Sequence, residues 1–174
     1  MSKLFRTTLW ILSGIGLIAF FFQTLSTFLI SPLMGLLSLL IAAILVALVI
    51  YLLQRSPMWA RPARLWTTLA FLWGGGVAVA LALISAGPVM QLAIGSGWVD
   101  AMMSWSGAYP EEISKATGVI FVLMSFRQLN RPWHGWMVGA VVGLGFEACE
   151  NILYGAMGAT MHPDSDIQGL FEMW

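Results

Sequence analysis

Residues 33–53, LMGLLSLLIAAILVALVIYLL, decide the fold, because this stretch contains no charged side chain. An α-helix advances about 1.5 Å per residue, so a helix of this length crosses the roughly 30 Å hydrocarbon core of a bilayer. The stretch therefore predicts a membrane-spanning helix.

The whole chain has the composition of a membrane protein. Of its 174 residues, 59% are hydrophobic and only 9% are charged, which is far outside the balance of a soluble domain. The net charge is zero and Lys and Arg form no basic run, which excludes an electrostatic surface for nucleic acid. The single Cys149 can form neither an intrachain disulfide nor a cysteine-based zinc motif.

We expect a single integral-membrane domain over residues 1–174, with the fold class all-α: a polytopic bundle of about five transmembrane helices. Residues 88–110 are too interrupted for a span and too apolar for a free linker, so they predict an extracytoplasmic segment at the membrane interface. The expected spans are residues 9–30, 33–53, 65–87, 111–126 and 133–159.

The basic residues predict the orientation of these spans. If five spans alternate, seven of the eight Lys and Arg residues fall on one side of the membrane. Positive residues gather on the cytoplasmic side of membrane proteins. We therefore expect a cytoplasmic N-terminus, with the residues after Ala159 outside, and Lys115 is the one cation that lies within a span.

Carboxylates lie within the last two expected spans. The sequence EEISK places Glu111 and Glu112 at or inside the outer boundary, and GFEACENILYG places Glu147 and Glu150 in an otherwise apolar helix. A bare carboxylate there costs several kcal/mol. The two spans form a hairpin around RQLNRP, so at about 1.5 Å per residue the two pairs come level.

Helix periodicity places further residues beside this acidic cluster. Gly135, Gly139 and Gly143 recur every fourth residue and predict a smooth face for close packing, which continues through Glu147 to Asn151. The cluster predicts protonation, a salt bridge or a bound cation as compensation for the buried charge.

Lys115 lies four residues after Glu111 and three after Glu112, so its ammonium can reach either carboxylate. Structural roles compete with a functional one. The helix dipole favours acids in a first turn after Pro110, and Glu147 and Glu150 could be hydrogen-bonding anchors for helix packing. Level acids on two neighbouring helices are hard to explain by packing alone, which favours a site.

These residues resemble the PrsW family of intramembrane proteases, within the wider group that contains the CAAX-type prenyl proteases. The family pattern Glu-Glu-x-x-Lys resembles Glu111, Glu112 and Lys115, shortly after a proline. The second pattern, Phe-x-x-x-Glu-Asn in a Gly-rich helix, resembles Phe146, Glu150 and Asn151. The resemblance covers roughly residues 105–160.

The resemblance implies a metal-dependent endopeptidase of the bacterial cytoplasmic membrane that cleaves single-span, membrane-anchored proteins, anti-sigma factors among them. It implies a divalent metal, zinc, with Glu112 and Glu150 as ligands. Carboxylates and a histidine can bind such a cation while a free glutamate acts as general base. The implied catalytic residues are Glu111, Glu112 and Glu150, supported by Lys115, Phe146, Glu147 and Asn151.

The family's later helices carry a histidine motif that completes the metal site, and we expect that histidine to come from beyond Trp174. The 174-residue chain alone is then expected to be incomplete and inactive. Two other interpretations stay open. Intramembrane carboxylates also mark cation and proton transporters, and a noncatalytic pseudoprotease is the third possibility. The sequence gives neither the substrate nor the oligomeric state.

Overall fold

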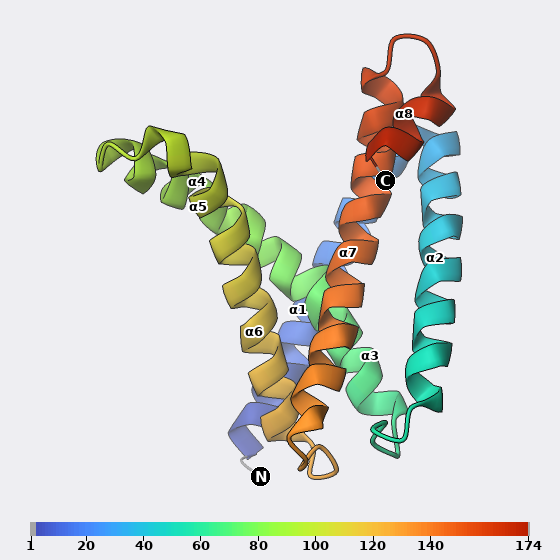
Figure 1. The fold of residues 1–174 in the computed structure, drawn as a ribbon, viewed down its shortest axis with the longest axis vertical. Coiled ribbons are helices and arrows are strands. Elements are labelled where there is room, and N and C mark those ends of the chain that lie inside the picture. Colours follow the sequence, from blue (N-terminus) through green and yellow to red (C-terminus); the bar gives the residue numbers. More distant parts are fainter. Residues whose placement is uncertain (1–2, 174) are drawn as a thin grey trace.

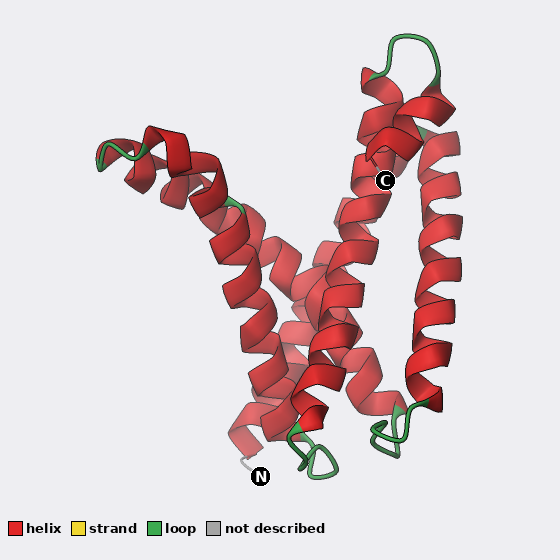
Figure 2. Ribbon diagram, in the orientation of Figure 1, coloured by secondary structure: helices red, strands yellow, loops and turns green. Residues whose placement is uncertain are grey.

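The computed structural model describes residues 3–173, and all regular secondary structure within them is helical (Figure 2). This confirms the predicted all-α fold of a polytopic helix bundle. The elements are α1 (Lys3–Ile30), α2 (Pro32–Arg55), α3 (Arg64–Leu72), η1 (Trp73–Ala78), α4 (Val79–Gly95), η2 (Val99–Ala101), α5 (Met102–Ser106), α6 (Ala108–Ser125), α7 (Trp133–Met161) and α8 (Asp166–Met173).

Within residues 3–173, four helical segments are long and apolar enough to cross a membrane: α1, α2, the continuous helix Arg64–Gly95, and α7. The helix α6 forms where the fourth span, residues 111–126, was expected, but it is not among these segments, because Glu111, Glu112 and Lys115 make it too polar. Its passage through the membrane stays a prediction.

The third span differs most from its expected bounds. The helix that begins at Arg64 continues to Gly95, past the end expected at Gly87, with Pro88 inside it. The dipeptide Gly-Pro is typical of a helix end in water. In an apolar environment a continuous helix leaves fewer backbone hydrogen-bonding groups unpaired than any alternative, so a proline within it is tolerated. The segment 88–110 therefore begins as helix and continues through the short η2 and α5.

The π-helical turn η1, with the sequence WGGGVA, is the crossing point of three helices. A methyl group on Gly74 would lie 2.9 Å from the backbone nitrogen of Phe146 in α7. One on Gly76 would lie 2.7 Å from Cα of Gly16 in α1. Only glycine allows backbones to approach this closely, so the glycine run fixes where α1 and α7 pass the third helix.

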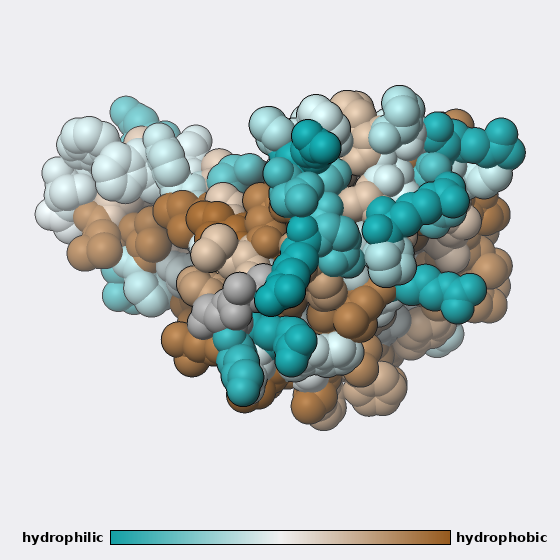
Figure 3. Space-filling model, turned by 90° about the horizontal axis from the view of Figure 1, so that it is seen from below, coloured by the Kyte–Doolittle hydropathy of each residue, from teal (hydrophilic) through white to brown (hydrophobic). Residues whose placement is uncertain are grey.

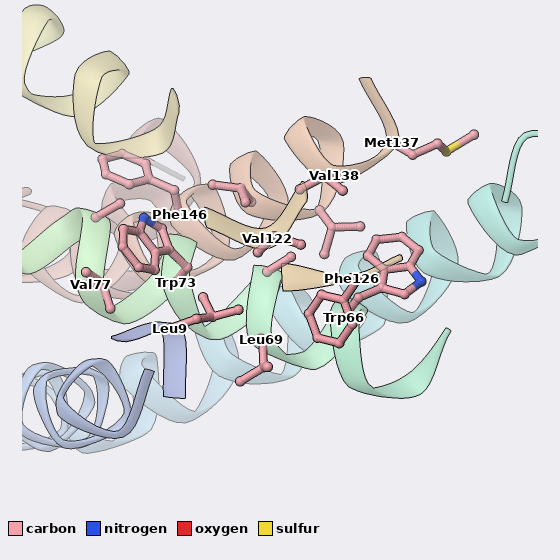
Figure 4. Close-up of a cluster of buried hydrophobic side chains, with 14 of the residues drawn as sticks. Leu9, Trp66, Leu69, Trp73, Val77, Val122, Phe126, Met137, Val138 and Phe146 are labelled. Carbon is pink, nitrogen blue, oxygen red and sulfur yellow. The ribbon is translucent and has the colours of Figure 1, made fainter. Parts of the chain in front are cut away.

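The hydrophobic core surrounds α7. Half of the apolar window of α7 is buried, compared with 17% for α1 and 11% for α2. Many large apolar side chains of α1 and α2 are exposed. A soluble protein rarely exposes so much apolar surface, so this exposure fits an integral membrane protein. Figure 4 shows part of the core, including Trp66, Trp73, Val122, Val138 and Phe146, which are each at most 1% exposed.

The two ends of the bundle differ. The first described residues and the loops 56–63 and 126–132 lie together at the lower end in Figure 1, whereas α8 packs beside the last turns of α7 at the upper end. Figure 3 looks onto the lower end, where hydrophilic side chains gather around the loops. The cation-bearing segments therefore share one end of the molecule, and which side of the membrane this end faces stays a prediction.

Candidate active site

The helices α6 and α7 form an antiparallel pair joined by the loop 126–132. A methyl group on Gly135 would lie 3.9 Å from Leu123, and one on Gly139 would lie 3.9 Å from Val119. Each four-residue step along one helix is thus matched by a step along the other. Continued by two turns, this register places the first turn of α6 level with Glu147.

Lys115 lies at the centre of the pair. Its ammonium Nζ is 2.9 Å from Oε1 of Glu112 on its own helix and 4.0 Å from Oε1 of Glu147 on α7. The same ammonium stands over the buried ring of Phe146, 3.9 Å from the ring centroid. The Lys115 side chain is only 16% exposed, so these contacts replace most of its solvent.

Glu150 is half-buried one turn further along α7. Its carboxylate interacts electrostatically with Glu111 and Glu147, and it lies beside the hydroxyl of Tyr154. The side chain of Glu111 is near Gly107, where α6 begins. Glu111 therefore lies within electrostatic range of Glu150, while Lys115 holds Glu112.

The start of α6 explains how Glu111 reaches this place. Pro110 lies in the first turn of the helix, where a missing N–H group breaks no helical hydrogen bond. The Glu111 N–H donates to the Gly107 carbonyl at 3.3 Å. An acid in the first turn is also favoured by the helix dipole, so this structural role and a functional role are compatible.

Trp73 fixes α6 against the third helix, and sequence reasoning did not identify it. Its indole Nε1–H donates to the Ser114 carbonyl at 3.0 Å, one residue before Lys115. Its ring stacks on Phe121, with centroids 5.2 Å apart, and lies against Gly118. The signal was present in the run WGGG, which marks a close crossing beside a buried tryptophan.

The expected glycine face of α7 is only partly correct. Gly135 and Gly139 make ordinary contacts with α6, but a methyl group on Gly143 would have no neighbour within 4 Å. The close approach is at Gly145 instead, where a methyl group would lie 3.0 Å from the carbonyl carbon of Phe71. The stripe was predicted from the interval of four alone, and that interval does not say which face meets a neighbour.

The two histidines lie at the ends of α7, away from the carboxylates. The N–H of Arg131 donates to Nδ1 of His134 at 3.0 Å. The N–H of Ser165 donates to Nδ1 of His162 at 3.0 Å, beyond the other end of the helix. His162 follows Glu150 by about 18 Å of helix, so both histidines stabilise chain turns rather than the acidic cluster.

The described residues do not form a complete metal centre. Their carboxylates offer oxygen ligands that suit a divalent cation, but residues 3–173 contain no group of three or more His, Cys, Asp or Glu side chains placed to hold one. Lys115 supplies positive charge where a cation would compensate Glu112 and Glu147. Asn151, the remaining motif residue, is half-buried next to Glu150 on α7.

A family model matches more than half of the chain. A family model described as PrsW family intramembrane metalloprotease matches residues 61–174, which include α3, α6 and α7 with all the motif residues. No curated protein and no solved structure matches the chain.

Proposed function

The chain belongs to the PrsW family of intramembrane metalloproteases, and we propose that it is itself an endopeptidase that cleaves single-span, membrane-anchored proteins. Anti-sigma factors are the substrates we propose. The bacterial cytoplasmic membrane is the proposed location, with the N-terminus in the cytoplasm.

One observation supports this function above all others. Two acidic segments that are far apart in the sequence face each other across α6 and α7, with Lys115 between Glu112 and Glu147. Charged groups in an apolar bundle are expensive, and a cluster that converges on one level is typical of a functional site rather than of packing. The cluster also contains the residues that resemble the two family patterns, and all of them lie within the matched residues 61–174.

We assign the roles from the contacts. Glu111, which lies within electrostatic range of the half-buried Glu150, is the general base that removes a proton from the attacking water. Lys115 holds Glu112 and Glu147 in place and keeps a positive charge beside the reacting carbonyl. Phe146 supports the lysine through its ring face. Asn151 is proposed to orient the neighbouring Glu150.

The family implies a divalent metal, and the fit of zinc is incomplete. Zinc sites in enzymes combine carboxylates with histidine or cysteine, and neither His134 nor His162 lies near the cluster. Glu112 and Glu150 are the ligands we propose, and Glu112 would have to give up its contact with Lys115 to bind the metal. Metal content of the purified protein, measured with and without the Glu150→Gln change, tests this assignment.

The function is tested with the protein in liposomes and a single-span reporter substrate. Any cleavage should be lost on Glu150→Gln, because a proposed metal ligand is removed while the volume of the side chain stays the same. Such cleavage should also stop with a chelator and return with added divalent metal. Chelator-sensitive cleavage by residues 1–174 alone would show that the histidine expected from beyond Trp174 is dispensable. The matched control is Asp100→Asn, which neutralises an exposed acid in η2, outside the cluster, and should leave cleavage unchanged.

The opposite results are equally clear. Undiminished cleavage by Glu150→Gln, with substrate and protein both intact, removes Glu150 from the chemistry. Cation movement across the same liposomes without any cleavage supports a transporter instead.

A further inference from the structure

A second site lies at the opposite end of α6 from the acidic cluster. A cavity of about 1010 Å³ opens at the end of the bundle that contains the first turns of α1 and the loops 56–63 and 126–132. Figure 3 looks onto this face. The residues that line it are Lys3, Arg6, Gln54, Trp59, Arg61, Pro62, Ala63, Arg64, Leu65, Ser125, Phe126, Arg127 and Gln128.

The cavity is strongly cationic. Five of its lining residues are basic and none is acidic: Lys3, Arg6, Arg61, Arg64 and Arg127. Within residues 3–173 the salt bridges involve only Lys115 and His162, so these five cations have no carboxylate partner there. Five like charges around one cavity repel each other, and an anion in the cavity would relieve that repulsion.

The floor of the cavity is apolar and held in shape by the loops. Trp59 and Phe126 are each 8% exposed, and the Trp59 ring packs on Trp66 with centroids 4.7 Å apart. The Gln128 amide Nε2 donates to the Pro62 carbonyl at 3.2 Å and joins the two loops. The cavity therefore combines a cationic rim with a rigid apolar floor.

We propose that this cavity binds the phosphate headgroup of an anionic phospholipid. Arginine forks match phosphate oxygens in pairs, and the apolar floor suits the glycerol and upper acyl carbons. The cavity lies where the helices α2 and α6 end and the helix that begins at Arg64 starts, which is where we expect lipid headgroups to lie. A basic pocket between membrane helices is suited to such a ligand. A free phosphate would match the rim but leave the apolar floor unused.

The site is independent of the proposed protease chemistry. Ser125, which lines the cavity, follows Lys115 by about 15 Å of helix. Binding there can therefore be measured without a substrate and without activity.

The test is native mass spectrometry of the detergent-solubilised protein incubated with phosphatidylglycerol or with phosphatidylcholine of the same acyl chains. We expect retained phosphatidylglycerol and little retained phosphatidylcholine. The pair Arg61→Gln and Arg127→Gln should weaken phosphatidylglycerol binding by about 25-fold, at roughly fivefold per cation. The matched pair is Arg55→Gln and Arg131→Gln, which removes the same charge from the same end but outside the cavity, and should change binding less than twofold.

A further variant guards against a folding defect of the double change. Gln54→Glu adds a negative charge to the cavity rim without truncating any cation, and it should weaken phosphatidylglycerol binding about fivefold or more. Equal losses for the two arginine pairs would mean a diffuse surface potential, and would overturn the site. Equal retention of both lipids would overturn it as well. Competition by glycerol phosphate at equal concentration would assign the cavity to a soluble phosphate ester and overturn the lipid.

Discussion

Gly118→Ala should be the most informative single change near the candidate active site. A methyl group on Gly118 would overlap Cδ1 and Nε1 of the Trp73 ring and lie 2.7 Å from its Cγ. Ordinary contacts begin at 3.4 Å, so the two helices must separate by more than about 0.7 Å. Trp73 cannot turn away, because it is 1% exposed and stacked on Phe121. Its hydrogen bond to the Ser114 carbonyl, at 3.0 Å, also opposes the shift.

The expected cost follows from these contacts. Overpacking a filled core costs about 1–3 kcal/mol, and weakening the indole hydrogen bond adds up to about 1 kcal/mol. Alanine returns up to about 1 kcal/mol through its higher helix propensity. We therefore expect Gly118→Ala to lower the free energy of unfolding by about 1–3 kcal/mol, measured by SDS titration in mixed micelles. Gly143→Ala is the control, because a methyl group there would have no neighbouring atom within 4 Å. This change should leave the free energy of unfolding unchanged or raise it slightly.

A double-mutant cycle tests the stated cause. In a Trp73→Ala background the clash is gone, and the Gly118 methyl group enters the cavity left by the indole. Gly118→Ala should then be neutral or stabilising, so its effect changes sign between the two backgrounds. Equal destabilisation in both backgrounds would refute the reasoning, and so would a Gly118→Ala variant as stable as Gly143→Ala.

Three further predictions concern the site, the orientation and the end of the chain. Lys115→Gln should lower the free energy of unfolding by about 1 kcal/mol in the same titration, because it removes the ion pair with the mostly exposed Glu112 and the contact with the Phe146 ring. Unchanged stability would contradict the bridging role of Lys115. In a Cys149→Ala background, an impermeant outside reagent should label Ser96→Cys and not Ser56→Cys, and the reverse pattern would invert the proposed orientation. Gly158→Ala should release α8 from α7, because its methyl group would lie 3.0 Å from the carbonyl carbon of Gly169 in α8. Limited proteolysis should then cut α8 earlier than in the unchanged protein. Unaltered protection would show that the contact is not needed.

Sequence reasoning predicted what depends on hydrophobic length and missed what depends on close packing. Long apolar runs indicated helices at α1, α2 and α7, because a membrane leaves the backbone few alternatives. The π-helical turn η1 has no comparable signal, since it depends on where α1 and α7 cross the third helix. The end of α4 was missed for a different reason. Gly87 and Pro88 indicate a helix end in water, but an apolar environment keeps the helix continuous through them.

Chain geometry predicted which helices carry the candidate site and at what level its acids lie. It did not predict which acidic side chains lie next to each other. Hairpin arithmetic placed the acids of α6 and α7 on one level, and i,i+3 spacing placed Lys115 beside Glu112, where the structure has it. Which carboxylate meets Glu150 depends on side-chain direction across two helices, and spacing alone cannot give it. The cationic cavity was invisible in the sequence because its basic residues come from three separate segments, none of which forms a basic run.

The polarity of α6 links the fold to the site. The helix α6 is too polar to count as a membrane-spanning helix because it carries Glu111, Glu112 and Lys115 of the first motif. It is therefore stable in the bundle only where α7 compensates these charges. Glu147 and the Phe146 ring supply that compensation through Lys115. Replacing the motif charges of α6 with apolar residues should therefore strengthen its insertion while removing the proposed activity. Such opposed effects on stability and function distinguish a functional cluster from a structural one, since losing a structural cluster would weaken both.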